Sequence, residues 1–231
     1  MRYDAVVFDL FGTLVPTPPI EPFMEDHRRT AASIGVDADA YMRAWSSVDM
    51  ALKRSIGIFP TMAAAVKAVC DEMGVAVSEE QLAQASASRI AATREVLLAP
   101  RPDAIETLDR LTAAGLRRGL ISDCNDEVVQ IWPETPFARR IQAAVFSCKE
   151  GIKKPDRRLY DLVSSRLGLN PDQCLFIGDG ASPELTGALQ AGMDAVLICP
   201  LGEADVIRAR QEVQNWSGPV VTSLIQILKL V

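Results

Sequence analysis

The chain has 231 residues, of which 48% are hydrophobic and 23% are charged, so it holds enough apolar material for one large domain or for a core with an insert. Its formal net charge of −6 argues against nucleic-acid-binding and membrane-surface proteins, because both classes need a cationic face. No apolar run approaches the ~20 residues that span a bilayer, and the first residues lack the apolar region of a signal peptide. We therefore expect a cytoplasmic protein that binds neither nucleic acid nor membrane.

The five cysteines are spaced singly, and no two of them form a CxxC pair. This spacing indicates neither a zinc site nor a disulfide framework, so we interpret them as reduced packing residues. Cys124 stands apart because it lies in a polar segment that follows a predicted strand.

The first predicted element is a strand formed by the apolar residues around Val6 and Phe8, and it ends at Asp9. Gly12 and Thr13 follow, a small turn-forming residue and a hydroxyl. In open α/β sheets the ligand crevice lies outside the carboxyl ends of the strands. Asp9 is therefore a candidate reactive carboxylate, although an ordinary loop after a strand could have the same sequence.

Closely spaced prolines end this segment, and the residues that follow predict helices only. Ser78 and Gln81 form a capping-box pattern at the start of one of these helices. We expect an all-α insert over residues 17–97, and a core domain built from residues 1–16 and 98–231. The amphipathic, alanine-rich stretches of the insert are residues 38–53, 62–73 and 78–95.

After the insert, helices and strands alternate, which is typical of a parallel sheet with crossover helices. The strands are apolar throughout, as expected where helices cover both faces. The predicted fold class is therefore α/β, a parallel-sheet core with the inserted all-α unit. The expected strands are residues 116–121, 143–147, 174–178, 195–198 and 219–222, and the expected helices are residues 104–114, 155–167, 183–191 and 223–229.

The second strand of the core is followed by Ser122, Asp123, Cys124 and Asn125. A hydroxyl and several backbone N–H groups at the start of a helix suit an oxyanion. The same residue types are also common helix caps, so this segment alone leaves both interpretations open.

The third and fourth strands are followed by Lys154, Asp179 and Glu184. We place Pro155 in the first turn of a helix, where the neighbouring Lys154 would favour a bound anion. Asp179 lies between two glycines at a strand end and is a candidate ligand for a hard cation such as Mg²⁺. Glu184 is a weaker candidate, because the helix dipole alone favours a carboxylate in a first turn.

These strand ends meet at one edge of a parallel sheet, so we expect their side chains to lie together. Such a set suits metal-assisted phosphoryl transfer, in which Asp9 attacks phosphorus and Mg²⁺ binds Asp9 and Asp179. Ser122 and Lys154 would stabilise the remaining negative charge.

The same segments resemble the four motifs of the haloacid dehalogenase (HAD) superfamily, and the resemblance covers essentially the whole chain. It implies a Rossmann-like core, a mobile helical cap of the C1 type over residues 17–97, a nucleophilic Asp9 and usually Mg²⁺. It also implies that the backbone carbonyl of Phe11 is a metal ligand. The matching segments are residues 9–13, Ser122, residues 154–156 and residues 178–184. The predicted site comprises catalytic Asp9, Ser122 and Lys154, substrate-binding Thr13, Asp123, Cys124 and Asn125, and metal-binding Asp9, Asp179, Glu184 and the Phe11 carbonyl.

Phe11 departs from the phosphatases of this family, which have a second aspartate there to protonate the leaving alkoxide and then to activate water. A benzyl group transfers no proton, and such help is worth ~10²–10⁴ in rate. An aromatic residue at this position is similar to the 2-haloacid dehalogenase branch, which works without a metal. That branch has Ser-Ser-Asn in the fourth motif, whereas this chain has Gly178-Asp179-Gly180, the metal-binding form.

Three functions stay open on the sequence. We favour a Mg²⁺-dependent hydrolase of a small phosphorylated metabolite, because Asp179 without a cation would repel Asp9. The second is a metal-independent dehalogenase of short 2-halo acids, and the third is a catalytically weak protein that binds a phosphorylated ligand or a protein partner. Neither the physiological substrate nor the oligomeric state follows from the sequence. Candidate carboxylate-binding residues of the cap are Arg28, Arg29 and Arg43, while His27 is interpreted as a solvated or capping residue.

Overall fold

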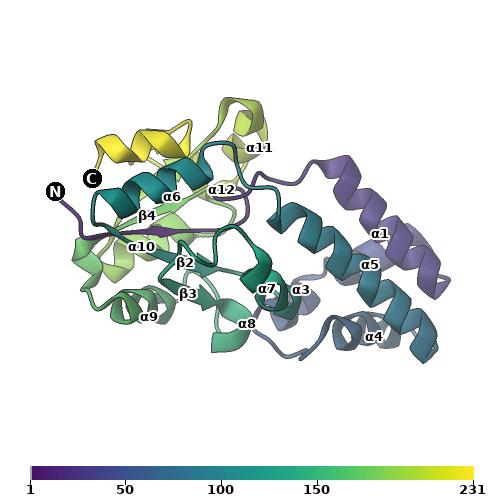
Figure 1. Ribbon diagram of the computed structural model, residues 1–231. Helices are drawn as coiled ribbons and strands as arrows, with labels where there is room; N and C mark the ends of the chain where they lie inside the picture. Colours follow the sequence, from purple (N-terminus) through teal and green to yellow (C-terminus); the bar gives the residue numbers. More distant parts are fainter. Residues whose placement is uncertain (1) are drawn as a thin grey trace.

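The computed structural model describes residues 2–231, and its centre is a six-stranded parallel sheet in the order β3-β2-β1-β4-β5-β6 (Figure 1). The α/β class expected from the sequence is confirmed. None of the described helices combines the length and apolar character needed to cross a membrane. The strands are β1 (Ala5–Phe8), β2 (Arg117–Ser122), β3 (Ala143–Phe146), β4 (Cys174–Gly178), β5 (Asp194–Ile198) and β6 (Val220–Val221).

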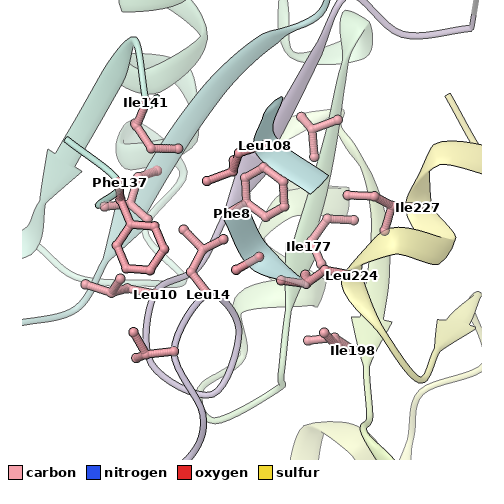
Figure 2. Packing of buried hydrophobic residues seen from close by; sticks show 14 of the residues in the cluster. Phe8, Leu10, Leu14, Leu108, Phe137, Ile141, Ile177, Ile198, Leu224 and Ile227 are labelled. Atoms are coloured by element: carbon pink, nitrogen blue, oxygen red, sulfur yellow. The ribbon is translucent and has the colours of Figure 1, made fainter. Parts of the chain in front are cut away.

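Successive residues of β1 point to opposite faces of the sheet, and both faces are buried. Val6 and Phe8 join one hydrophobic cluster, while Ala5 and Val7 join a second one. Figure 2 shows the first cluster, in which Phe8 packs among side chains from β4, α6 and the C-terminal segment. One face is covered by α6 (Ala104–Ala113), α7 (Asp126–Ile131) and the 3-10 helix η4 (Leu224–Lys229), and the other by α9 (Arg157–Leu167) and α10 (Glu184–Ala191).

Two expected helices of the core differ from the structure. The helix expected from residue 155 begins at Arg157, because the Asp156 carboxylate accepts a hydrogen bond from the Arg158 N–H (3.0 Å) and caps it. Pro155 therefore lies before the helix, and its placement in the first turn is wrong. The C-terminal helix is a 3-10 helix instead of an α-helix. The short elements are α8 (Ser147–Glu150), α11 (Ala204–Arg208), α12 (Gln211–Gln214), and the 3-10 helices η1 (Trp132–Glu134), η2 (Pro171–Gln173) and η3 (Leu201–Glu203).

Residues between β1 and α6 form helices, as expected, but the helix predicted over residues 38–53 is two helices. Ser46 ends the first, and the Ser47 hydroxyl accepts a hydrogen bond from the Met50 N–H (3.3 Å) to start the next. The capping box of Ser78 and Gln81 is confirmed. The five helices are α1 (Ile20–Ile34), α2 (Ala38–Trp45), α3 (Val48–Ser55), α4 (Met62–Glu72) and α5 (Glu79–Leu97).

The five helices bury a hydrophobic cluster of their own, which includes Tyr41 and Trp45. This cluster agrees with a separate cap, while the exact boundaries 16/17 and 97/98 stay a prediction. Three polar side chains lie beside this hydrophobic cluster. Arg89 forms an ion pair with Asp26 and donates a hydrogen bond to the His27 ring (3.2 Å to Nε2). His27 is 1% exposed, so its interpretation as a solvated residue is wrong.

His27 provides a test of this polar group. Its Nδ1–H donates to the Phe23 carbonyl (2.8 Å), and burial together with the Arg89 charge lowers the His27 pKa to about 4. As pH falls from about 6.5 to about 4, His27 becomes protonated in the unfolded chain while it stays neutral in the folded protein. The free energy of unfolding therefore falls over this pH range. We expect wild type to lose about 3 kcal/mol of unfolding free energy relative to His27→Asn across this pH range, because each unit of difference between the folded and unfolded pKa is worth about 1.4 kcal/mol.

Urea unfolding at several pH values measures this difference. Because the buried carboxylates titrate in both proteins, the comparison of the two isolates the histidine. Parallel pH profiles for wild type and His27→Asn would mean that the folded imidazole protonates normally.

Candidate active site

Side chains from three separate segments meet at the carboxyl ends of β1 and β4. Asp9 follows β1, and its N–H donates to the Ile177 carbonyl (2.9 Å), which joins it to the end of β4. The Lys154 ammonium donates to Asp9 Oδ1 (2.5 Å) and to the Glu184 carboxylate. All three side chains are buried. Asp9 and Lys154 are 145 positions apart in the chain but lie side by side, as expected from segments that follow parallel strands of the same sheet.

The loop after Asp9 is anchored by both apolar and polar contacts. Leu10 and Leu14 insert into the core cluster shown in Figure 2, so the loop between them stays close to the sheet. Arg101 donates to the carbonyls of Gly12 (2.8 Å) and Thr13 (3.0 Å). Sequence reasoning assigned no role to Arg101, because its partners lie 88 and 89 positions away.

Two glycines, Gly12 and Gly178, provide space for the carboxylates because they have no side chain. Gly12 has φ +79°, and a Cβ there would lie 1.6 Å from Asp179 Oδ2. A Cβ on Gly178 would lie 2.4 Å from Glu184 Oε1. Any larger residue at either position would displace an acid, so these glycines are part of the site.

Arg210 gives Asp179 a cation that sequence reasoning missed. It lies between α11 and α12, where its guanidinium contacts the Asp179 carboxylate and donates to the Asp179 carbonyl (2.7 Å). The signal for it was weak, because Arg210 follows no strand and belongs to no motif. Its position depends on how the C-terminal helices pack against the end of β4.

The three acids form a cluster that fits a divalent cation. Ligand oxygens of Asp9, Asp179 and Glu184 all lie within 4.8 Å of one another. They are buried and face two cationic side chains, Lys154 and Arg210, so one negative charge stays uncompensated. An all-oxygen donor set with excess negative charge suits Mg²⁺. The Phe11 carbonyl, two residues after Asp9, stays the predicted fourth ligand.

Burial and mutual repulsion dominate the electrostatics of the cluster. Burial, and then the Asp9 charge, raise the pKa of Asp179 and raise the pKa of Glu184 well above its ordinary value. For Lys154, burial lowers the pKa, but Asp9 and Glu184 outweigh it, and the net pKa lies well above the ordinary value. Lys154 is therefore a permanent cation of the site.

The end of β2 and the segment that follows it lie close to this cluster. Some of their polar groups have hydrogen-bond partners in the protein and others do not. Ser122 is fully buried, and its hydroxyl has no hydrogen-bond partner within residues 2–231. Asp123 Oδ1 accepts a hydrogen bond from the Lys154 N–H (2.9 Å). The Cys124 N–H already donates to the Ser147 hydroxyl (2.9 Å), and Asn125 donates to Glu127 (3.1 Å). The substrate-binding roles of residues 123–125 stay predictions, and Ser122 has the hydroxyl that is free to bind.

Thr13 and Phe11 complete the predicted set. The Thr13 hydroxyl is buried, and no partner for it lies within the described chain. Phe11 packs against the core cluster and borders a largely apolar cavity of about 540 Å³ between the loop after β1, α1 and α5. Arg29 and Arg89 also border this cavity. The three arginines considered from the sequence, Arg28, Arg29 and Arg43, are exposed.

Comparisons with known proteins identify the family of the chain. The family model for haloacid dehalogenase-like hydrolases matches residues 3–192. An (S)-2-haloacid dehalogenase 4A from Burkholderia cepacia is 27% identical over 198 residues, covering 84% of this chain and 82% of that protein. A glyceraldehyde 3-phosphate phosphatase from Methanothermobacter thermautotrophicus is 27% identical over 137 residues, covering 58% of each.

The fold also resembles a solved structure over almost its whole length. The L-2-haloacid dehalogenase from Xanthobacter autotrophicus, with chloropropionic acid covalently bound, superposes with a TM-score of 0.66 at 20% identity, covering 99% of this chain and 98% of that one. The family match, the strand-end acids and the parallel sheet lead to one conclusion: this chain belongs to the haloacid dehalogenase superfamily of hydrolases.

Proposed function

We propose that the chain hydrolyses a small phosphorylated metabolite with Mg²⁺ as cofactor, through an aspartyl-phosphate on Asp9. The observation that carries the proposal is the buried cluster of Asp9, Asp179 and Glu184 within 4.8 Å. Displacement of halide from carbon needs one attacking carboxylate, whereas a phosphoryl group adds negative charge that must be neutralised. The two extra acids are most economically explained by a cation that binds with the phosphoryl group.

Each residue of the cluster has a role in this reaction. An Asp9 carboxylate oxygen attacks phosphorus while the bond from phosphorus to the leaving oxygen breaks. Lys154 stays protonated, donates to the attacking Asp9 carboxylate and balances developing charge. The Ser122 hydroxyl, which has no partner within the described chain, donates to a phosphoryl oxygen. Water then attacks phosphorus and releases phosphate from Asp9. When held by Asp9, Asp179, Glu184 and the Phe11 carbonyl, Mg²⁺ supplies positive charge to the phosphoryl oxygens.

Phe11 restricts the leaving group. No acid stands at this position to protonate a departing alkoxide, so the preferred substrates are those whose leaving group is already acidic, such as acyl or aryl phosphates. The apolar cavity beside Phe11 offers room for the apolar part of such a leaving group, such as an aryl ring.

Metal-independent dehalogenation is the second candidate, and Arg210 favours it. The sequence argument against it was that Asp179 would repel Asp9 without a cation. Arg210 contacts the Asp179 carboxylate and supplies that charge from the protein itself. Together with Phe11, this contact makes a halide-releasing reaction on Asp9 chemically consistent, because halide needs no proton to leave.

We expect phosphate release from acetyl phosphate or p-nitrophenyl phosphate to require Mg²⁺, to stop in EDTA and to return when Mg²⁺ is added. Asp9→Asn removes the attacking oxygen and should reduce turnover by at least about 10³-fold. Malachite-green phosphate assays measure both effects.

A parallel assay measures chloride release from chloroacetate in EDTA. Chloride release that depends on Asp9, with no phosphate release under any condition, would replace the proposal by the second candidate. Phosphate release that persists in EDTA would contradict the role of the metal.

Phe11→Asp tests the missing proton donor. If the lack of an acid at this position limits the rate, the variant should raise turnover of alkyl phosphates by up to about 10²-fold, with a smaller effect on acetyl phosphate. Phe11→Asn has nearly the same size without the proton and serves as the control. An equal gain in both variants would attribute the change to space, and no gain in either would mean that another group already donates the proton.

Arg210→Gln tests whether Asp179 exchanges one cation for another. Removing the guanidinium leaves a buried carboxylate unpaired, so the metal-free variant should lose roughly 2–4 kcal/mol of stability. Mg²⁺ should restore more stability to the variant than it adds to wild type, as measured by thermal unfolding. Arg208→Gln, an exposed neighbour on α11, is the control. Equal responses to Mg²⁺ in wild type and variant would contradict metal binding at Asp179.

A further inference from the structure

Two thiols lie in contact beside the predicted site. The Sγ atoms of Cys124 and Cys148 are 4.0 Å apart. All five cysteines are free thiols, and within residues 2–231 the other three make no such sulfur–sulfur contact. The contact follows from the sheet, because Ser122 of β2 pairs with Phe146 of β3, and each cysteine lies two residues beyond its strand.

The contact is held in place by the serine that precedes Cys148. Ser147 Oγ accepts a hydrogen bond from the Cys124 N–H (2.9 Å) and donates to the Ser55 carbonyl at the end of α3 (2.6 Å). Gly57 also lies against Cys148, since a Cβ there would be 1.9 Å from the Cys148 carbonyl oxygen. The thiol pair therefore lies where the segment after β2, α8 and the predicted cap meet, and α3 packs against α8 (Figure 1).

We propose that Cys124 and Cys148 are an oxidative modification site, which a peroxide closes to a reversible disulfide. A disulfide needs a separation of about 2.05 Å between sulfur atoms, and thiols in contact reach it by side-chain rotation and a small loop shift. The two cysteines come from segments whose backbones are already tied through Ser147.

The environments of the two thiols give them different roles. Cys148 is half-buried, and the contact with Cys124, aided by the Lys149 charge, lowers the pKa of Cys148. Burial raises the pKa of Cys124. A more acidic and more accessible thiol is the one that reacts first with an oxidant.

The reaction balances with hydrogen peroxide as oxidant. The Cys148 thiolate attacks one peroxide oxygen, the O–O bond breaks, and the released hydroxide takes up a proton to become water. The Cys124 thiol then attacks the sulfenic sulfur, the S–S bond forms, and a second water leaves with the Cys124 proton. Two thiols lose two electrons in total, which reduce one peroxide to two waters.

Closure would act on the predicted site through the segment after β2. Cys124 follows Asp123, whose carboxylate accepts the Lys154 N–H (2.9 Å). Drawing Cys124 toward Cys148 shifts this segment and links it covalently to α8. This consequence for turnover rests on the proposed function, whereas formation of the disulfide does not.

The test treats the reduced full-length protein with hydrogen peroxide, blocks the remaining thiols under denaturing conditions and measures the intact mass. We expect two of the five thiols to become protected. Trypsin should then release peptides 119–139 and 141–149 as one linked species, which dithiothreitol separates. Loss of phosphate or halide release in proportion to the linked fraction, with recovery on reduction, measures the effect on the site.

Cys148→Ser should abolish the linked species, and Cys199→Ala, a buried cysteine elsewhere, should leave it unchanged. Cys124→Ala provides a second test if Cys148→Ser folds poorly, because it leaves Cys148 to stop at the sulfenic or sulfinic acid. Five free thiols after peroxide treatment, or a Cys148 sulfinic acid without linked peptides in wild type, would overturn the proposal. If the linkage forms in an inactive protein, the oxidation site stands and the proposed function fails.

Discussion

Three carboxylates buried at the ends of β1 and β4 are the constraint on which the rest of this structure depends. In a site that excludes water, such acids repel one another, and burial raises the pKa of Asp179 and Glu184. Lys154 and Arg210 offset this repulsion from segments that are distant in sequence. The parallel sheet makes the arrangement possible, because it brings the segments that carry Asp9, Lys154 and Asp179 to the same edge, and helix packing adds Arg210.

In the proposed mechanism, the residue two positions after Asp9 decides which reactions the site supports well. With Phe11 the site keeps the predicted nucleophile, a permanent cation and a cluster suited to a metal, while it lacks a proton donor there. Leaving groups that depart without a proton are therefore favoured, whether they are acidic oxygen leaving groups or halides.

The helical insert is tied to the core by specific contacts as well as by its two chain crossings. Ser147 joins the segment after β2 to the end of α3, and Arg101, just after the insert, holds the loop that follows Asp9. The Ser147 contact therefore links the insert directly to the segment after β2, which carries predicted site residues. The ion pair of Asp26 and Arg89 lies inside the insert, so its interior is specified by charge as well as by apolar packing.

The local sequence pattern determined several features of this protein. Apolar runs placed Asp9 and Asp179 at strand ends, and Ser78 marked a helix start that the structure confirms. These features depend on near neighbours in the chain, so they can be inferred from it. Tertiary structure alone decided the burial of His27, the pairing of Arg210 with Asp179, and the contact between Cys124 and Cys148. Each of these depends on which surfaces pack together, and a charge or thiol finds its partner only after strand register and helix packing have placed it.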